Sequence, residues 1–156
     1  MLKVAINGFG RIGRSAYKAA INKKSKFKVV AVNDLTEPDN LAYLLKYDSV
    51  YGPWKGHKVS ATKNSIIVDG QKILVFAQKD PSLLPWKKLG IDIVIESTGF
   101  FTEKEGAELH LKAGAKKVII SAPTKSLDIN TYVIGANENK LQKNEKIISN
   151  ASCTTN

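Results

Sequence analysis

The glycine-rich stretch between residues 2 and 13 constrains the fold of this chain more than any other feature. Its sequence, LKVAINGFGRIG, begins with an apolar run typical of a buried strand and ends in G-x-G-x-x-G at Gly8, Gly10 and Gly13. An apolar stripe at helical spacing follows at once, formed by Ile12, Ala16, Ala20 and Ile21. Strand, glycine turn and helix in this order predict a dinucleotide-binding βαβ unit.

Each glycine of the turn has a separate predicted role. Gly8 allows the tight turn, Gly10 lets the backbone approach a pyrophosphate, and Gly13 lets the helix pack closely on the strand. The free N–H groups and positive dipole at the helix start favour phosphate binding there. Alone, the motif is weak evidence, because a glycine turn without a ligand has the same spacing.

Two further features favour nucleotide binding. A second apolar strand, Phe27–Val32, ends in Asn33 and Asp34, and Asp34 lies 21 residues after the last glycine. An acidic residue at that spacing binds the adenosine ribose in dinucleotide folds, although it could instead cap a turn or helix. The chain has two arginines against 22 lysines, and both, Arg11 and Arg14, lie in or beside the turn, where planar recognition of phosphate is useful.

The composition limits the class of protein. A chain of 156 residues with 43% hydrophobic residues suffices for one domain. Neither a transmembrane run nor an N-terminal signal segment is present in the sequence, so we expect no membrane partner. The single cysteine argues against a disulfide framework and favours a reducing, cytoplasmic location.

The net charge of +10 raises nucleic-acid binding as an alternative function. However, the lysines are scattered, no run exceeds two, and aromatic residues do not alternate with them as on a single-strand binding surface. We therefore expect a solvated lysine-rich surface with a bias toward anionic small ligands, and no nucleic acid as the primary partner. No residue is assigned to a metal.

Hydrophobic periodicity predicts an α/β fold with a doubly wound, mostly parallel sheet and a small antiparallel hairpin insertion. Later strands are expected at Val59–Thr62, Ser65–Val68, Lys72–Phe76, Ile91–Ile95, Val118–Ile120, Thr131–Ile134 and Lys146–Ile148. Helices are expected from Pro38 to about Lys46 or Tyr47, over Pro85–Leu89, and from a capping box at Thr102–Glu105 to Gly114. Residues 47–57 are expected to form a loop, and Asp69-Gly70 a hairpin turn.

Several predicted strands end in small polar residues. These ends are Asn7-Gly8, Asn33-Asp34, Ser97-Thr98-Gly99, Ser121 and Ser149-Asn150. Strands often end in turn residues, so one such end means little. Five of them, together with a dinucleotide turn, predict a ligand crevice at the carboxyl edge of a parallel sheet.

The last residues, Ser149–Asn156, suggest chemistry at Cys153. Asn150 or Ser152 could cap a new helix, whose dipole would favour the thiolate of Cys153 in the first turn. A thiolate beside a nicotinamide could add to an aldehyde and form an acyl-thioester after hydride loss. The alternative is that a lone cysteine is a small buried hydrophobic residue.

Six motifs in order resemble the NAD-binding half of a phosphorylating glyceraldehyde-3-phosphate dehydrogenase. They are NGFGRIGR from Asn7, VNDL from Val32, LLKYDSVYG from Leu44, ESTGFF from Glu96, KKVIISAP from Lys116 and SNASCTTN from Ser149. The resemblance covers essentially the whole chain, and SNASCTTN is its most specific part. It implies a Rossmann-type fold in which residues 1–156 form the NAD-binding domain, ending just after the cysteine motif, with the catalytic domain outside this chain.

The resemblance also implies roles for single residues. Arg11 and Ile12 would contact the pyrophosphate, Asp34 the ribose, and Ser121 the nicotinamide side of the crevice. The full set implied for NAD is Asn7, Gly8, Gly10, Arg11, Ile12, Asp34, Lys79, Thr98, Gly99 and Ser121. Lys79 stands where the family usually has arginine.

Cys153 would be the nucleophile of this reaction, with Ser152 and Thr154 contacting the substrate phosphate or the attacking inorganic phosphate. The general base would be a histidine of the second domain, so His57 and His110 are expected to be surface residues. The implied substrates are glyceraldehyde 3-phosphate and inorganic phosphate, and the implied assembly is a homotetramer. Erythrose-4-phosphate dehydrogenase and a separate NAD-binding module without activity are the alternatives.

Overall fold

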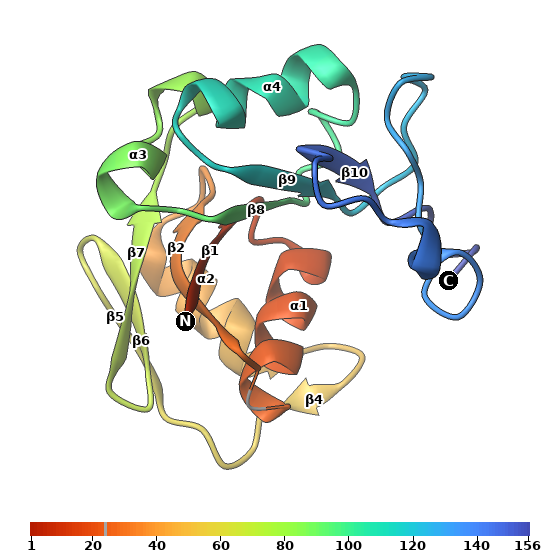
Figure 1. Ribbon diagram of the computed structural model, residues 1–156. Coiled ribbons are helices and arrows are strands. Elements are labelled where there is room, and N and C mark those ends of the chain that lie inside the picture. Colours follow the sequence, from red (N-terminus) through yellow and green to blue (C-terminus); the bar gives the residue numbers. More distant parts are fainter. Residues whose placement is uncertain (24) are drawn as a thin grey trace.

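A single eight-stranded sheet organises the molecule (Figure 1). The computed structural model describes residues 1–23 and 25–156. The strand order is β10-β9-β8-β1-β2-β7-β6-β5. Its parallel strands are β1 (Leu2–Asn7), β2 (Phe27–Asn33), β7 (Gln71–Phe76), β8 (Ile93–Glu96), β9 (Lys117–Ile120) and β10 (Ile147–Ser149). The antiparallel part is β5 (Val59–Thr62) and β6 (Ser65–Val68), which continues onto β7.

Strand β1 lies at the point where the direction of winding reverses. The chain proceeds from β1 to β2 and β7 on one side, then crosses to β8 on the other side of β1 and continues to β9 and β10. This order confirms the predicted doubly wound, mostly parallel α/β fold. In such sheets a crevice opens at the carboxyl ends of the strands beside the reversal.

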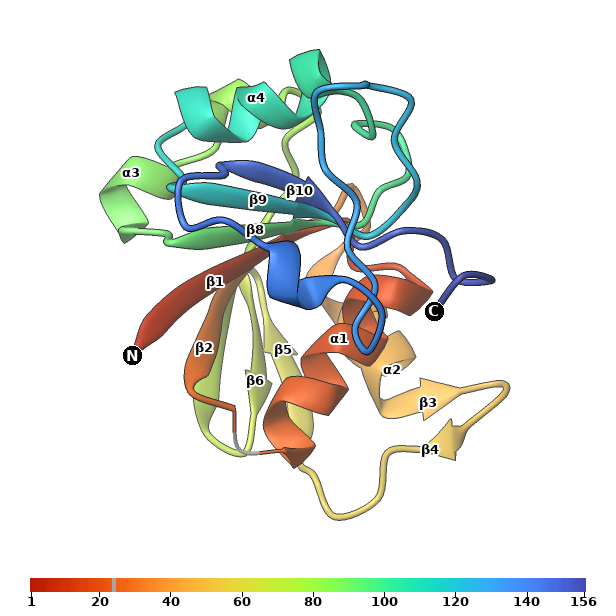
Figure 2. The ribbon, with the colours of Figure 1, turned by 45° about the vertical axis from the view of Figure 1, so that its right-hand side comes forward.

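Helices cover both faces of the sheet (Figure 2). Helices α1 (Arg11–Asn22) and α2 (Pro38–Lys46) lie on one face, and α3 (Trp86–Leu89) and α4 (Lys104–Lys112) lie on the other. Two 3-10 turns, η1 (Pro81–Leu83) and η2 (Glu138–Lys140), complete the helical elements. Side chains alternate along each strand, so neighbouring residues of β1 enter separate cores: Val4 and Ile6 pack with Tyr17 of α1, and Ala5 packs with Trp86 of α3.

The turns follow from local chemistry. Asp69 and Gly70 adopt φ values of 50° and 80°, the left-handed conformations of a two-residue hairpin turn, which confirms the predicted β6–β7 hairpin. Residues 47–57, predicted to be a loop, contain a two-stranded sheet of β3 (Tyr47–Asp48) and β4 (Gly52–Pro53). Such short strands fall below the length that hydrophobic periodicity can detect.

The predicted capping box at the start of α4 is wrong. The N-cap is Glu103, and no side chain of the predicted Thr102–Glu105 box makes the expected cap bond. Instead, the hydroxyl of Ser126 accepts from the backbone N–H of Lys104 at 3.0 Å and donates to Oε2 of Glu103 at 2.9 Å. The helix start is therefore satisfied by a residue from a distant segment.

Two apolar patterns also differ from prediction. The strand expected at Thr131–Ile134 is reduced to a single bridge between Thr131 and Ser149. Across that bridge Tyr132 N donates to the carbonyl oxygen of Ser149, while on the other side of the segment the side chain of Asn137 accepts from Val133 N and donates to the carbonyl oxygen of Thr131. Ile12 is 50% exposed, because the face of α1 that meets the sheet is centred on Gly13, Tyr17 and Ala20.

None of the helices formed by residues 1–23 and 25–156 has both the length and the apolar character needed to cross a bilayer.

We predict that Gly13→Ala destabilises the fold strongly, whereas Gly10→Ala does not. A Cβ at residue 13 would lie 2.2 Å from the carbonyl oxygen of Gly8, while one at residue 10 meets no atom within 4 Å. Urea denaturation should show a loss of at least about 2 kcal/mol in the free energy of unfolding for Gly13→Ala. The matched Gly10→Ala control should lose less than about 1 kcal/mol, mainly through a poorer helix cap. Equal losses for both variants would contradict this prediction.

Candidate functional site

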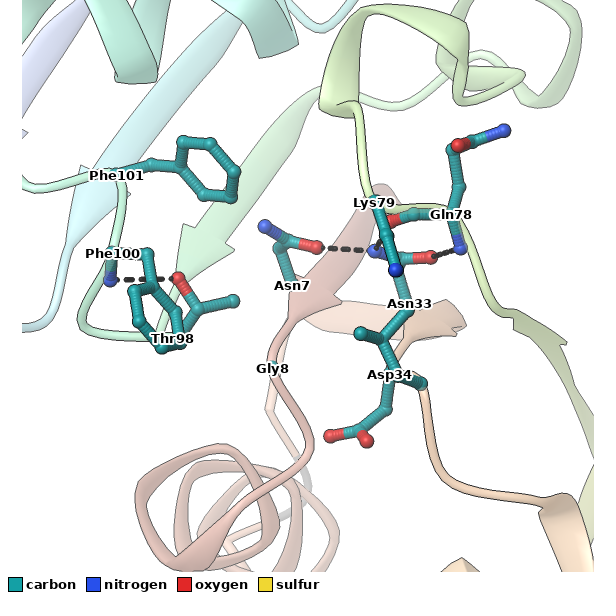
Figure 3. A pocket seen from close by; sticks show the side chains of 10 residues that line it. Asn7, Gly8, Asn33, Asp34, Gln78, Lys79, Thr98, Phe100 and Phe101 are labelled. Atoms are coloured by element: carbon teal, nitrogen blue, oxygen red, sulfur yellow. Dashed lines mark hydrogen bonds between the residues drawn. The ribbon is translucent and has the colours of Figure 1, made fainter.

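A cavity of about 280 Å³ lies at the carboxyl ends of β1, β2 and β8, beside the reversal of the sheet. It is lined by Asn7, Gly8, Asn33, Asp34, Leu35, Gln78, Lys79, Thr98, Phe100 and Phe101. Figure 3 shows Phe100 and Phe101 on one side, Gln78 and Lys79 on the opposite side, and Asn7 between them. Two aromatic rings facing polar groups give a cavity that can hold a flat ring with a polar edge.

The glycine turn forms the rim of this cavity through very close backbone contacts. A Cβ on Gly8 would lie 2.7 Å from backbone atoms of Ser97 and Thr98, and its φ of +87° also favours glycine. The hydroxyl of Ser97 donates to the carbonyl oxygen of Gly8 at 2.7 Å. The space around Gly10 is open. The turn can therefore present backbone N–H groups to an anion without a side chain in the way.

The carboxylate of Asp34 is held by two backbone donors at the cavity. Its Oδ2 accepts from Phe9 N at 2.8 Å, and its Oδ1 accepts from Thr36 N at 3.0 Å. Capping a turn and binding a ribose are therefore not exclusive, since each carboxylate oxygen keeps a lone pair for a ligand hydroxyl. The two bonds fix the orientation that such a ligand would meet.

The two arginines surround the start of α1 but do not line this cavity. Arg14 donates from Nη1 to the carbonyl oxygen of Phe9 at 3.0 Å, and Arg11 donates from Nη2 to Ser49 Oγ at 3.2 Å. Burial lowers the pKa of Arg14 from its ordinary value, and the carboxylate of Asp48 opposes that effect. Of the other predicted cofactor residues, Asn7, Gly8, Asp34, Lys79 and Thr98 line the cavity; Gly10, Ile12, Gly99 and Ser121 are not among its lining residues.

The prediction that His110 is a surface residue is wrong. Its side chain is fully buried between Trp86 and Glu96, which bond to its two ring nitrogens at 3.1 and 2.9 Å. The other histidine, His57, is 22% exposed and bonds to Asp69 at 2.6 Å. Amino-acid composition alone does not distinguish the buried environment of His110 from the partly exposed environment of His57.

The C-terminal residues form a single turn that Ser152 caps. Its hydroxyl accepts from Thr155 N at 3.1 Å, and its carbonyl oxygen accepts from Asn156 N at 3.2 Å. Of the two expected caps, Ser152 is the one used. Cys153 is exposed in this turn, and the hydroxyls of Ser152 and Thr154 lie 2.9 Å apart. None of these residues lines the cavity.

Sequence reasoning missed part of the cavity wall. Phe100 and Phe101 belong to the ESTGFF motif but have no predicted role, and neither do Leu35 and Gln78, yet all four line the cavity. Phe100 is 86% exposed. Their position is the sequence signal that could identify them, because both phenylalanines follow the polar turn Ser97–Gly99 at the end of β8.

Comparison with known proteins identifies the family. The model of the glyceraldehyde 3-phosphate dehydrogenase NAD binding domain matches residues 2–104. The chain belongs to the glyceraldehyde-3-phosphate dehydrogenase family. Its cofactor is NAD.

Individual dehydrogenases of the family match the whole chain. Glyceraldehyde-3-phosphate dehydrogenase of Thermotoga maritima is 61% identical over 157 residues, covering 100% of this chain and 46% of that enzyme. Those of Mycoplasma pneumoniae and Geobacillus stearothermophilus are both 56% identical, covering 99% of this chain and 45% and 46% of the enzymes. The chain thus spans less than half the length of these relatives.

We predict that Asp34→Asn destabilises the fold by about 1–3 kcal/mol, because an amide can accept from only one of the two backbone N–H groups and opposes the other. The matched control is Asp39→Asn, since Asp39 is exposed in the first turn of α2. Losing that charge should cost about 0.3–1 kcal/mol through the helix dipole. Thermal and urea unfolding of the three proteins measure the difference. An Asp34→Asn protein as stable as the wild type would contradict the assigned bonds.

Proposed function

We propose that the protein containing this chain is a phosphorylating glyceraldehyde-3-phosphate dehydrogenase, in which residues 1–156 form the NAD-binding domain. The observation that carries the proposal is the Asp34 carboxylate, fixed by two backbone N–H groups at a cavity where the strand order reverses. The 61% identity to the Thermotoga maritima enzyme supports the same activity. The Asp34 and LLKYDSVYG motifs favour the triose substrate over erythrose 4-phosphate.

The residues present fit the cofactor. Asp34 would hold the adenosine ribose, and the turn around Gly8 and Gly10 would cradle the pyrophosphate. Lys79 would lie beside the adenine, and Thr98 along the cofactor crevice. We also propose that Arg11, Ile12 and Ser121 bind the cofactor from outside the described cavity lining, and that Asn7 and Gly99 belong to the same set. When bound, NAD supplies the acceptor for a hydride.

Cys153 is proposed as the nucleophile. Its sulfur adds to the carbonyl carbon of the aldehyde, and after loss of hydride and the hydroxyl proton that carbon is held as a thioester. Inorganic phosphate then attacks the thioester, the C–S bond breaks, and the acyl phosphate leaves with the thiolate restored. Ser152 and Thr154 would orient the phosphate groups with their paired hydroxyls. A general base from the remainder of the protein would take the hydroxyl proton.

The same proposal includes the assembly and the compartment. A homotetramer in the cytoplasm is proposed from the family resemblance and from the single cysteine. A separate NAD-binding module without activity is the second candidate function. Activity of the chain together with the missing part of the enzyme separates these two functions.

We predict that the chain binds NAD at least about tenfold more tightly than NADP, because the Asp34 carboxylate repels a 2′-phosphate. Leu35, the next residue, offers no positive charge to compensate. Isothermal titration calorimetry with each nucleotide measures the ratio. Asp34→Asn should reduce the preference for NAD over NADP, whereas Asp39→Asn should leave that preference unchanged. Equal or tighter binding of NADP to the wild type would refute the ribose role.

We predict that residues 1–156 alone show no useful dehydrogenase turnover, although they bind NAD. The two histidines are engaged elsewhere, His110 with Glu96 and His57 with Asp69, and a general base is typically worth ~10²–10⁴-fold in rate. A steady-state assay with glyceraldehyde 3-phosphate, NAD and inorganic phosphate tests this, with NAD titration of the same preparation as the control for folding. A rate near the enzyme median of ~10 s⁻¹ would place the base within these residues instead.

A further inference from the structure

A row of buried side-chain hydrogen bonds crosses the floor of the cavity. Asn7, Glu96 and Asn33 are the last residues of β1, β8 and β2, and the strand register places Asn7 opposite both of the others. Asn7 Nδ2 donates to Glu96 Oε2 at 2.6 Å, and Asn33 Nδ2 donates to Asn7 Oδ1 at 2.7 Å. Gln78 N closes the row by donating to Asn33 Oδ1 at 2.8 Å (Figure 3).

A second set of bonds reaches Glu96 from the opposite side. Trp86 Nε1 donates to His110 Nδ1 at 3.1 Å, and His110 Nε2 lies 2.9 Å from Glu96 Oε2. An indole nitrogen can only donate, so His110 Nδ1 must be the unprotonated nitrogen of the ring. The ring proton is then on Nε2 and points at Glu96. His110 is therefore held as the Nε2–H tautomer.

The directions of these bonds are fixed because both ends of the row are donors that cannot reverse. One end is the indole N–H of Trp86, and the other is the backbone N–H of Gln78. Donation runs inward from each end and converges on Glu96. Thr98 adds its backbone N–H and its hydroxyl to the other carboxylate oxygen, Oε1. All of these donors are satisfied only if the side chain at residue 96 accepts hydrogen bonds on both of its oxygens, as a carboxylate does.

Among residues 1–23 and 25–156, one donor hydrogen of the Asn7 amide has no acceptor. One hydrogen of its Nδ2 goes to Glu96, and the next neighbour in the described chain, His110 Nε2 at 3.4 Å, is itself a donor. Asn7 is 1% exposed and lines the cavity. In Figure 3 its amide nitrogen lies on the side away from Asn33, which takes the amide oxygen. A buried, unpaired N–H directed at a cavity is an unmet hydrogen bond that a ligand can satisfy.

We propose that Glu96 and His110 are positioning residues for the nucleotide: they fix the amide of Asn7 so that its free N–H faces the cavity. The inference rests on the nucleotide binding that belongs to the proposed function. The ligand chemistry is a hydrogen-bond acceptor, such as a ribose or phosphate oxygen of NAD. Glu96 also holds Thr98, whose hydroxyl oxygen accepts from Phe100 N, so the same carboxylate orders the aromatic wall.

The test is a double-mutant cycle on NAD affinity. Glu96→Gln keeps an oxygen toward Thr98 but places an amide NH₂ against the donors of Asn7 and His110, so NAD binding should weaken about tenfold. Asn7→Ala removes the proposed ligand donor. In that background Glu96→Gln should weaken binding less than about threefold, because the two residues act through one contact.

The matched control is Glu145→Gln. Glu145 also accepts several hydrogen bonds, from Asn130, Tyr132 and Gln142, but in a surface cluster outside the cavity lining. The NAD affinity of the Glu145→Gln protein should equal that of the wild type. Additive effects of Glu96→Gln and Asn7→Ala would overturn the positioning role while leaving NAD binding intact. Failure of the wild-type chain to bind NAD would instead overturn the cofactor site, and this inference with it.

A second measurement does not depend on any variant folding. Nitrogen-15 NMR of the labelled histidines in the wild-type chain at neutral pH should show His110 as the Nε2–H tautomer, with an unprotonated Nδ1. Addition of NAD should shift the side-chain amide resonances of Asn7 and leave the His110 tautomer unchanged. Observation of the Nδ1–H tautomer or of the imidazolium form would overturn the proposal, because either would break the inward direction of donation.

Discussion

The backbone contact among the glycine turn, helix α1 and strand β8 determines the geometry of the whole carboxyl edge. Gly13 packs against the carbonyl oxygen of Gly8, and Gly8 packs against the backbone of Ser97, with no space for a Cβ at either glycine. Close packing of this kind transmits displacements, because neither partner can yield. These contacts hold the carboxyl ends of β1 and β8 side by side in the sheet. Because the two strand ends are aligned, the side chain of Asn7 can bond to that of Glu96.

The fold class could be predicted because its determinants are local. A buried strand followed by glycines and an amphipathic helix specifies one βαβ unit, and Asp69-Gly70 specifies a hairpin from two residues alone. The failures depend on side-chain bonds that hydrophobic periodicity does not encode. Ser126 satisfies the start of α4 from 22 residues away. Asn137 bonds to the backbone of Thr131 and Val133 from six and four residues away, in a local turn that follows the short extended segment.

The candidate site divides in the same way. Asp34 could be found from its spacing to the glycines, and Thr98 from its place after a strand, whereas Lys79 was indicated only by the family resemblance. The buried pair of Glu96 and His110 could not be found, because it requires the register of β1 against β8 and the placement of α4 above them. A histidine on an amphipathic helix is as compatible with solvent as with a buried carboxylate. Only the presence of Trp86 on the opposite side decides its environment.

The cap that Ser126 provides for α4 has a consequence for the order in which the chain folds. Residues 104–112 leave the ribosome before Ser126 does, so this helix begins without the group that completes its first turn. Strand β9 lies between the helix and residue 126 in the sequence, so the cap closes a loop of 22 residues. The contacts of the β6–β7 hairpin close much shorter loops, and contacts between residues far apart in sequence form more slowly.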